Sequence, residues 1–289
     1  MLNGKRLSSR HFRAYYFLDG LLASIAQKEF PNRISVHVTP IHIAYVSPKA
    51  KDDAMRLADR NAFLLILAIT SGSADGWSYI GLGHAFVANM TGNTVLLGIA
   101  IFGEHGDILH PLLAIVFYAV GVTIGTCFTR RIKPDSVWSP SVSRALLLES
   151  ALLIAATIGW VSAGGAPDRL RSHALLACVA AGMGIQSGAL LPLRLPGVIT
   201  TYITGTWTTF VSGLALAGLQ QNRENDGPLG FEERLLIQAA FLAIYFLSAV
   251  GTGWAFRYAP KLIGIASLFP VLAVAGWSSL LSRRSAEIH

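Results

Sequence analysis

Residues 72–98 read GSADGWSYIGLGHAFVANMTGNTVLLG and carry polar side chains through a long apolar tract: Asp75, His84, Asn89, Thr91, Asn93 and Thr94. Residues 183–218, MGIQSGALLPLRLPGVITTYITGTWTTFVSGLALAG, follow the same plan. Each tract passes through a Gly-rich turn with a polar side chain and then reaches Thr-Gly followed by Asn or Thr. Polar and helix-weakening residues are costly in hydrocarbon unless they face protein, water or a ligand. The two tracts therefore predict a duplicated membrane protein with a polar site at its centre.

The composition also indicates a protein embedded in lipid. Of 289 residues, 53% are hydrophobic and only 13% are charged, whereas a soluble domain carries about 25% charged residues. The net charge of +7 could suit nucleic acid, but Lys and Arg lie beside the apolar segments and form no patch interleaved with aromatic residues. We therefore expect the Lys and Arg residues to lie in the cytoplasmic loops of a membrane protein in a lipid bilayer. We expect no nucleic-acid partner.

Apolar segments of about 20 residues, the length that a helix needs to cross a bilayer, follow one another with short polar links. They occupy residues 62–81, 84–103, 111–129, 145–163, 174–192, 197–218, 236–256 and 261–281. We predict an all-α integral membrane protein whose single transmembrane domain, 55–289, consists of two homologous repeats, 61–163 and 172–282. Residues 1–54 contain no spanning segment, and we expect a poorly structured or peripheral N-terminal extension.

The second segment of each repeat, 84–103 or 197–218, decides the topology. If both segments cross, the chain has eight spans. If both dip in and return, it has six full spans and two broken, re-entrant segments. The second arrangement places residues 130–144 and the C-terminal Arg283-Arg284 in the cytoplasm and residues 104–110 outside, which agrees better with the positive-inside rule. It also gives three spans in each half, and an odd number forces the halves into inverted orientations.

Acidic side chains within the apolar segments are the first candidates for chemistry. Asp75 is the stronger one, because a carboxylate at membrane depth must be paired, hydrated or protonated. It would bind a proton or a cation; alternatively, it caps a broken helix or pairs with a basic residue such as Arg194. Glu149 follows Arg144 by five residues near the start of its segment, which indicates a snorkelling carboxylate at the membrane interface.

The Thr-Gly turns suit a break in a helix, because Gly permits unusual backbone conformations and Thr and Asn side chains bond to freed backbone groups. We predict a solute or ion site lined by polar side chains of both tracts: Asp75, Asn89, Thr91, Asn93, Thr94, Gln186, Thr204 and Thr206. The alternative is helix packing through small residues. We favour packing for glycines spaced by four: Gly72/Gly76, Gly121/Gly125 and Gly184/Gly188. Gly251 and Gly253 would be the second repeat's counterparts of Gly121 and Gly125.

Signatures of catalysis and of cofactor binding are missing from the sequence. It contains no HExxH, no Walker loop and no GxSxG, and Gly182-Met183-Gly184 lacks the strand and the third glycine of a dinucleotide site. We therefore expect neither an enzyme nor a bound cofactor or metal.

The run GSADGWSYIGLGHAFVANMTGNTVLLG and its echo MGIQSGALLPLRLPGVITTYITGT resemble the YoaK-like family of bacterial transmembrane proteins, a domain of unknown function. The resemblance covers most of the chain, 60–280, and implies a multi-pass protein of the bacterial cytoplasmic (inner) membrane. It brings no substrate and no catalytic residues.

The function expected from the polar site is a transporter or permease for a small solute or ion. The alternative is a structural or regulatory membrane protein whose Gly and Thr motifs only pack helices. The expected partners are the lipid bilayer and an unknown small solute or ion, with a homo-oligomer as a further option.

Overall fold

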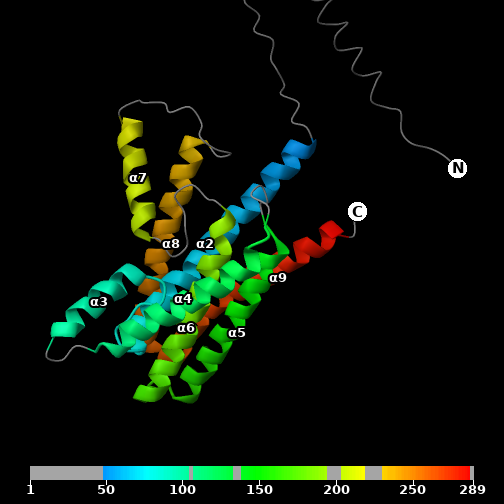
Figure 1. The fold of residues 1–289 in the computed structure, drawn as a ribbon. Coiled ribbons are helices and arrows are strands. Elements are labelled where there is room, and N and C mark those ends of the chain that lie inside the picture. The colour runs from blue at the N-terminus through cyan, green and yellow to red at the C-terminus, as the bar shows by residue number, and fades with distance from the viewer. Residues whose placement is uncertain (1–47, 104–106, 133–137, 194–202, 219–229, 287–289) are drawn as a thin grey trace, which may run out of the picture. The chain divides into compact units, whose positions relative to one another are not determined.

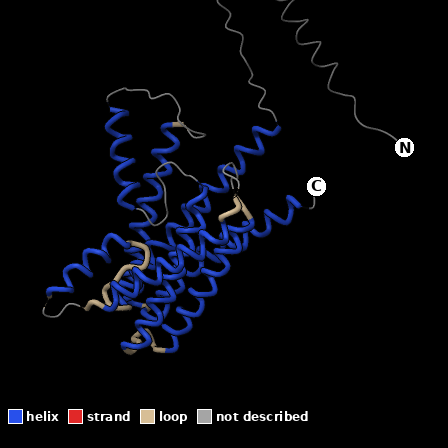
Figure 2. Tube along the Cα trace, viewed as in Figure 1, coloured by secondary structure: helices blue, strands red, loops and turns tan. Residues whose placement is uncertain are grey.

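The computed structural model describes residues 48–103, 107–132, 138–193, 203–218 and 230–286. These residues form helices joined by loops, and no strand occurs among them (Figure 2). The expected all-helical fold is confirmed. The boundary of the N-terminal extension stays a prediction, because residues 1–47 lie outside the described part; helix α2 already begins at Pro48.

Six of the helices are long and apolar enough to cross a membrane. They are α2 (Pro48–Gly81), α4 (Leu109–Thr129), α5 (Pro140–Ser162), α6 (Arg169–Leu190), α8 (Phe231–Tyr258) and α9 (Ile263–Ala286). A short 3-10 turn, η1 (Leu191–Leu193), extends α6, and another, η2 (Pro260–Leu262), precedes α9. The remaining helices, α3 (Met90–Phe102) and α7 (Ile203–Gly218), are shorter and stand beside the bundle (Figure 1).

The segment that contains α3 begins and ends at one end of the bundle. Gly83 is the second residue after the end of α2, and a Cβ atom placed on it would lie 2.2 Å from the ring of His110, the second residue of α4. Gly83 has a φ of +106° and His84 one of +59°, and these left-handed conformations reverse the chain. The segment therefore returns to its starting side, as the six-span arrangement requires.

Helix α7 returns toward the start of α8. Gln238 donates a hydrogen bond to Thr209 over 3.2 Å, and Gly213 faces Leu235, so α7 runs antiparallel to the first half of α8. Helix α8 in turn runs parallel to α2, because Gly72 meets Tyr245 and Gly76 meets Thr252. The start of α8 consequently lies at the opposite end of the bundle from the end of α2, so α3 and α7 approach from opposite ends.

Corresponding helices of the two predicted repeats occupy similar environments. In the most apolar window of each span, 67% of α2 and 72% of α6 is buried, against 44% of both α5 and α9 and 22% of both α4 and α8. Helix α4 packs on α6 as α8 packs on α2, and α5 packs on α6 as α9 packs on α2. Two repeats would produce this correspondence; the repeat itself stays a prediction.

Glycines spaced by four bring helices into backbone contact, as the packing interpretation predicted. A Cβ atom on Gly121 of α4 would lie 2.1 Å from the carbonyl oxygen of Ala181, and one on Gly184 of α6 would lie 2.2 Å from that of Tyr118. In contrast, nothing lies within 4 Å of the corresponding positions on Gly251 and Gly253. The match of this pair to Gly121 and Gly125 was therefore wrong.

The six-span topology can be tested with single cysteines placed at described positions, after replacement of the free Cys127 and Cys178. Ile108 and Ala166 stand in the loops before α4 and before α6, and Arg131 follows the opposite end of α4. We expect an impermeant thiol reagent to label Ile108→Cys and Ala166→Cys in intact cells and to leave Arg131→Cys unlabelled until the cells are opened. Labelling of Arg131→Cys alone would reverse the predicted topology.

Candidate functional site

A cavity of about 520 Å³ lies where the first residues of α3 and α7 come close to α4, α6 and α8. Its polar lining is supplied by the beginnings of both short helices and by side chains of three spans. The lining residues that carry the argument below are Asn89, Thr91, Thr204, Tyr118, Ser187 and Tyr245. Two segments separated by more than a hundred residues thus line one cavity; that this cavity is the predicted binding site stays a prediction.

Of the residues predicted to line the site, Asn89, Thr91 and Thr204 face the cavity. The others do not line it: Asp75, Asn93, Thr94, Gln186 and Thr206. Thr94 is exposed and bonds to the carbonyl of Met90, whereas Gln186 and Thr206 are buried, and Gln186 donates to Ser71 over 3.1 Å. Whether any of these residues binds a solute stays a prediction.

Asp75 holds the loop that leads into α3. Its Oδ1 atom accepts hydrogen bonds from the backbone N–H groups of Val87 at 2.8 Å and Ala88 at 2.7 Å. Its Oδ2 atom accepts a bond from the hydroxyl of Tyr245 at 2.5 Å. The side chain is only 4% exposed. Hydrogen bonds from three donors offset the free-energy cost of removing a carboxylate from water. Arg194, the sequence-based alternative partner, lies outside the described residues.

Two asparagines complete the support of the same loop. Asn93 is fully buried; its Oδ1 accepts from the N–H of Phe86 at 2.8 Å, and its Nδ2 donates to the carbonyl of Phe86 at 2.6 Å. Asn89 is the N-cap of α3 and accepts from the N–H of Gly92, which satisfies one of the helix's free donors. Asp75 and Asn93 thus fix the place where α3 begins, at the edge of the cavity.

Sequence reasoning missed the two tyrosines of the cavity. The carbonyl of Tyr118 in α4 touches Gly184 in the same way that the carbonyl of Tyr245 in α8 touches Gly72, and both tyrosines line the cavity. The signal was present in the sequence, because each tyrosine stands three residues before a small residue, Gly121 or Ser248. The incorrect match of Gly121 to Gly251 concealed it.

Glu149 lies deeper than the sequence indicated. Helix α5 begins at Pro140 and not at residue 145, so Glu149 is about 14 Å along the helix. Its side chain is fully buried, and Arg144 bonds to Pro140 and Ser141 instead. The expectation of an interfacial, snorkelling carboxylate was therefore wrong.

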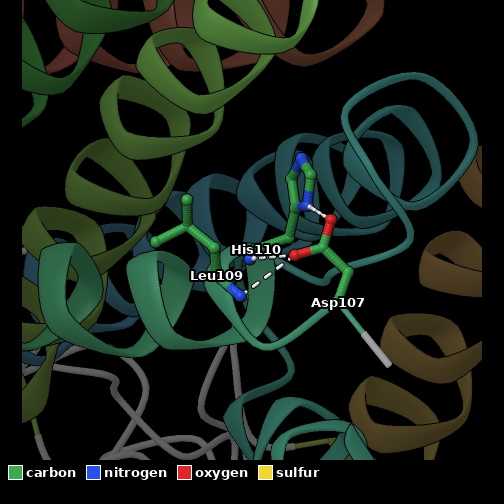
Figure 3. Close-up of polar contacts among 3 residues, drawn as sticks. All are labelled: Asp107, Leu109 and His110. Carbon is green, nitrogen blue, oxygen red and sulfur yellow. Dashed lines mark hydrogen bonds and ion pairs between the residues drawn. The ribbon is translucent and has the colours of Figure 1, made fainter. Parts of the chain in front are cut away.

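A polar cluster marks the end of the bundle beside Gly83 (Figure 3). Asp107 accepts from the N–H groups of Leu109 and His110 and lies 2.6 Å from Nδ1 of His110. The His110 ring packs on His173 at a centroid distance of 4.4 Å. Partial burial acts to raise the pKa of Asp107, but the hydrogen bonds and the attraction of His110 outweigh it, and the pKa is lowered below its ordinary value.

The lowered pKa of Asp107 predicts a small, acid-sensitive contribution to stability. The contribution is present above about pH 4, the ordinary pKa of an aspartate, and is lost as the pH falls through the lower pKa of the folded state. Because the Asp107 side chain is 40% exposed, we expect less than about 1 kcal/mol. Thermal unfolding in neutral and in strongly acidic detergent solution should differ less for Asp107→Asn than for the natural chain. An identical difference would contradict this contribution.

The fold and the cavity define a multi-pass helical membrane protein. Within its described residues, no group of three or more His, Cys, Asp and Glu side chains is arranged to hold a metal ion. The chain belongs to the family described as "Protein of unknown function (DUF1275)", whose family model matches residues 63–277.

A relative in Bacillus subtilis (strain 168), the UPF0700 transmembrane protein YoaK, is 33% identical over 160 residues, which cover 55% of this chain and 68% of the relative. The resemblance to the YoaK-like family is thereby confirmed. No solved structure matches the chain.

Proposed function

We propose that this protein is a transporter or permease for a small polar solute in the bacterial cytoplasmic membrane, and that the cavity is its binding site. The observation that carries the proposal is the convergence of α3 and α7 on one cavity from opposite ends of the bundle. Short helices that begin at a central site are the plan by which many secondary transporters bind their substrates.

The lining of the cavity favours a particular class of solute. Among the described residues that face it, none is Asp, Glu, Lys or Arg; hydroxyl, amide and backbone groups provide the polarity. The N-terminal residues of α3 and α7 also face it, and the N-terminus of a helix carries a partial positive charge. The site therefore suits a neutral, zwitterionic or anionic solute better than a cation.

The hydrogen bonds of Asp75 support the same proposal with a changed role for this residue. The sequence suggested that Asp75 handles charge directly, but its oxygens already accept from Val87, Ala88 and Tyr245. One of these donors, Tyr245, lines the cavity itself. We infer that Asp75 positions the loop before α3 and the Tyr245 hydroxyl, while Asn89, Thr91 and Thr204 contact the solute.

The proposal can be tested by filling the cavity from either short helix. Thr91 and Thr204 are exposed residues at the cavity, so tryptophan can be placed there without disturbing the packed core. We expect Thr91→Trp and Thr204→Trp to slow solute entry at least tenfold, because the indole ring would occupy the binding space. Entry can be measured by the re-swelling of proteoliposomes in light scattering, with glycerol, urea, glycine and sodium formate as probes.

Matched controls are available one turn further along the same helices. Thr94 and Thr208 are also exposed but do not line the cavity, so Thr94→Trp and Thr208→Trp should leave re-swelling unchanged. Equal slowing by all four variants would show that the cavity is not the route. Proteoliposomes that re-swell no faster than empty vesicles with any probe would favour the structural or regulatory alternative.

A further inference from the structure

Glu149 is the one acidic side chain in the described part of the chain that is buried without any hydrogen-bond partner. Its exposed fraction is 0%, and neither Oε1 nor Oε2 accepts or donates a bond. It lies about 14 Å along α5 from Pro140, near the middle of a hydrocarbon layer about 30 Å thick. A buried carboxyl group at this depth is costly, and its presence requires a reason beyond packing.

The surroundings of Glu149 are apolar or small. Its Cγ atom would lie 3.5 Å from a Cβ atom on Gly182 of α6, and Leu153 packs at the same place. No hydrogen bond or ion pair joins Glu149 to a described residue on any helix packed against α5. The charged and titratable residues of α4, α6, η2, α9 and α5 itself are Arg144, Arg169, Arg171, His173, Cys178, His110, Tyr118, Cys127, Lys261, Arg283 and Arg284. Helix α2, which meets α5 where Trp77 contacts Trp160, adds Lys49, Lys51, Asp52, Asp53, Arg56, Asp59, Arg60, Asp75 and Tyr79.

An ionised carboxylate is strongly disfavoured where neither a donor nor a cation reaches it, whereas the neutral acid is tolerated. The fully enclosed position next to Gly182 leaves no room for a larger ligand without movement of α5 or α6. The ligand that such a group can take up without rearrangement is a proton.

A series of buried polar groups lies between the neighbourhood of Gly182 and the cavity. Gln186 lies one turn after Gly182 on the same face of α6, and it donates to Ser71 of α2. Asp75 lies one turn after Ser71 and accepts from Tyr245, which lines the cavity. Gln186 and Ser71 are both fully buried. Gln186 and Ser71 are thus joined by a hydrogen bond, and Ser71 and Asp75 stand a single helical turn apart on α2.

We propose that Glu149 is a reversible proton-binding site in the membrane-buried core, which exchanges its proton with the cavity along the Gln186–Ser71–Asp75 series. Resting on the transport function proposed above, this makes solute movement proton-coupled: Glu149 gains a proton in one part of the cycle and releases it in another.

Covalent labelling tests the proton site without any knowledge of the solute. Dicyclohexylcarbodiimide is apolar and dissolves in the lipid core. It reaches Glu149 when α5 and α6 separate transiently, and it adds to the protonated carboxyl group, which ends as a stable N-acylurea. We expect mass spectrometry to find the adduct on Glu149 in mildly acidic vesicles, and several-fold less of it in alkaline ones. The Glu149→Gln variant is the control, and its α5 peptide should carry no adduct. Absence of labelling at every pH, or equal labelling at every pH, would overturn the proposal.

Proton movement is the second measurement. Proteoliposomes with an entrapped pH dye should show acidification or alkalinisation when a transported probe is added outside. Glu149→Gln keeps the shape of the side chain but cannot release a proton, so it should still let the probe pass while the dye signal disappears. An unchanged dye signal in this variant would refute the role of Glu149. If the natural chain moves no probe at all while its labelling still depends on pH, the transport function fails and the proton site stands.

Discussion

Replacing Gly121 with alanine is expected to destabilise the protein by about 3 kcal/mol, although alanine is the better helix former. The added methyl group would lie 2.1 Å from the carbonyl oxygen of Ala181 and 3.0 Å from the Cα atom of Gly184. Both neighbours belong to a helix backbone, so α4 and α6 must separate along their whole contact. Gly184→Ala should have a similar effect, because its methyl group would meet the carbonyl of Tyr118 at 2.2 Å.

Gly251→Ala is the matched control for the glycine prediction. Gly251 also lies within a long span, but nothing stands within 4 Å of the added methyl group, and alanine should stabilise the helix by about 0.5 to 1 kcal/mol. The two substitutions are therefore expected to change the stability in opposite directions. Thermal unfolding in detergent, followed by the loss of the monodisperse peak in size-exclusion chromatography, measures both. Equal effects would show that the α4–α6 contact is not as close as described.

Asp75→Ala is expected to have the second large effect, a loss of roughly 3 kcal/mol or more. It leaves the N–H groups of Val87 and Ala88 and the hydroxyl of Tyr245 without their acceptor in a buried place, and each such group costs about 1 to 3 kcal/mol. The start of α3 should loosen as a result, so solute entry into proteoliposomes should fall together with thermal stability.

Conservative variants separate support of the loop from direct binding by Asp75. Asp75→Asn retains one oxygen for Val87 and Ala88, so it should be much less harmful than alanine, and Tyr245→Phe should cost about 1 kcal/mol. If Asp75 instead carried the charge in transport, Asp75→Asn would abolish solute entry while stability remained close to that of the natural chain. That outcome would restore the role which the sequence first suggested for this residue.

The sequence predicted the fold class well, because the fold class depends on strong, local signals. Long apolar segments identify the spans. Polar residues inside such segments must face protein, water or a ligand, and the Thr-Gly turns that carry them stand at the beginnings of α3 and α7. The packing of Gly121 and Gly184 could also be predicted, since spacing by four places small residues on one helix face.

The sequence could not show which polar side chains would form hydrogen bonds with other residues of the chain. Asp75 and Asn93 bond to residues 86–88 because His84 and Gly83 turn the chain back along α2, and this reversal has no clear sequence signature. Glu149 was misplaced because α5 begins before its apolar run does. Tyr118 and Tyr245 were missed because the register between the halves depends on contacts with α6 and α2, not on glycine spacing alone.

The convergence of α3 and α7 on one solute-conducting cavity is tested most directly by cross-linking their first residues. In a chain without Cys127 and Cys178, a bismaleimide should join Thr91→Cys to Thr204→Cys within one molecule, and solute entry into proteoliposomes should fall sharply after the reaction. The pair Thr94→Cys and Thr208→Cys, on the same helices but away from the cavity, should give little of either effect. Absence of the 91–204 cross-link, or undiminished solute entry once it has formed, would contradict a shared central site.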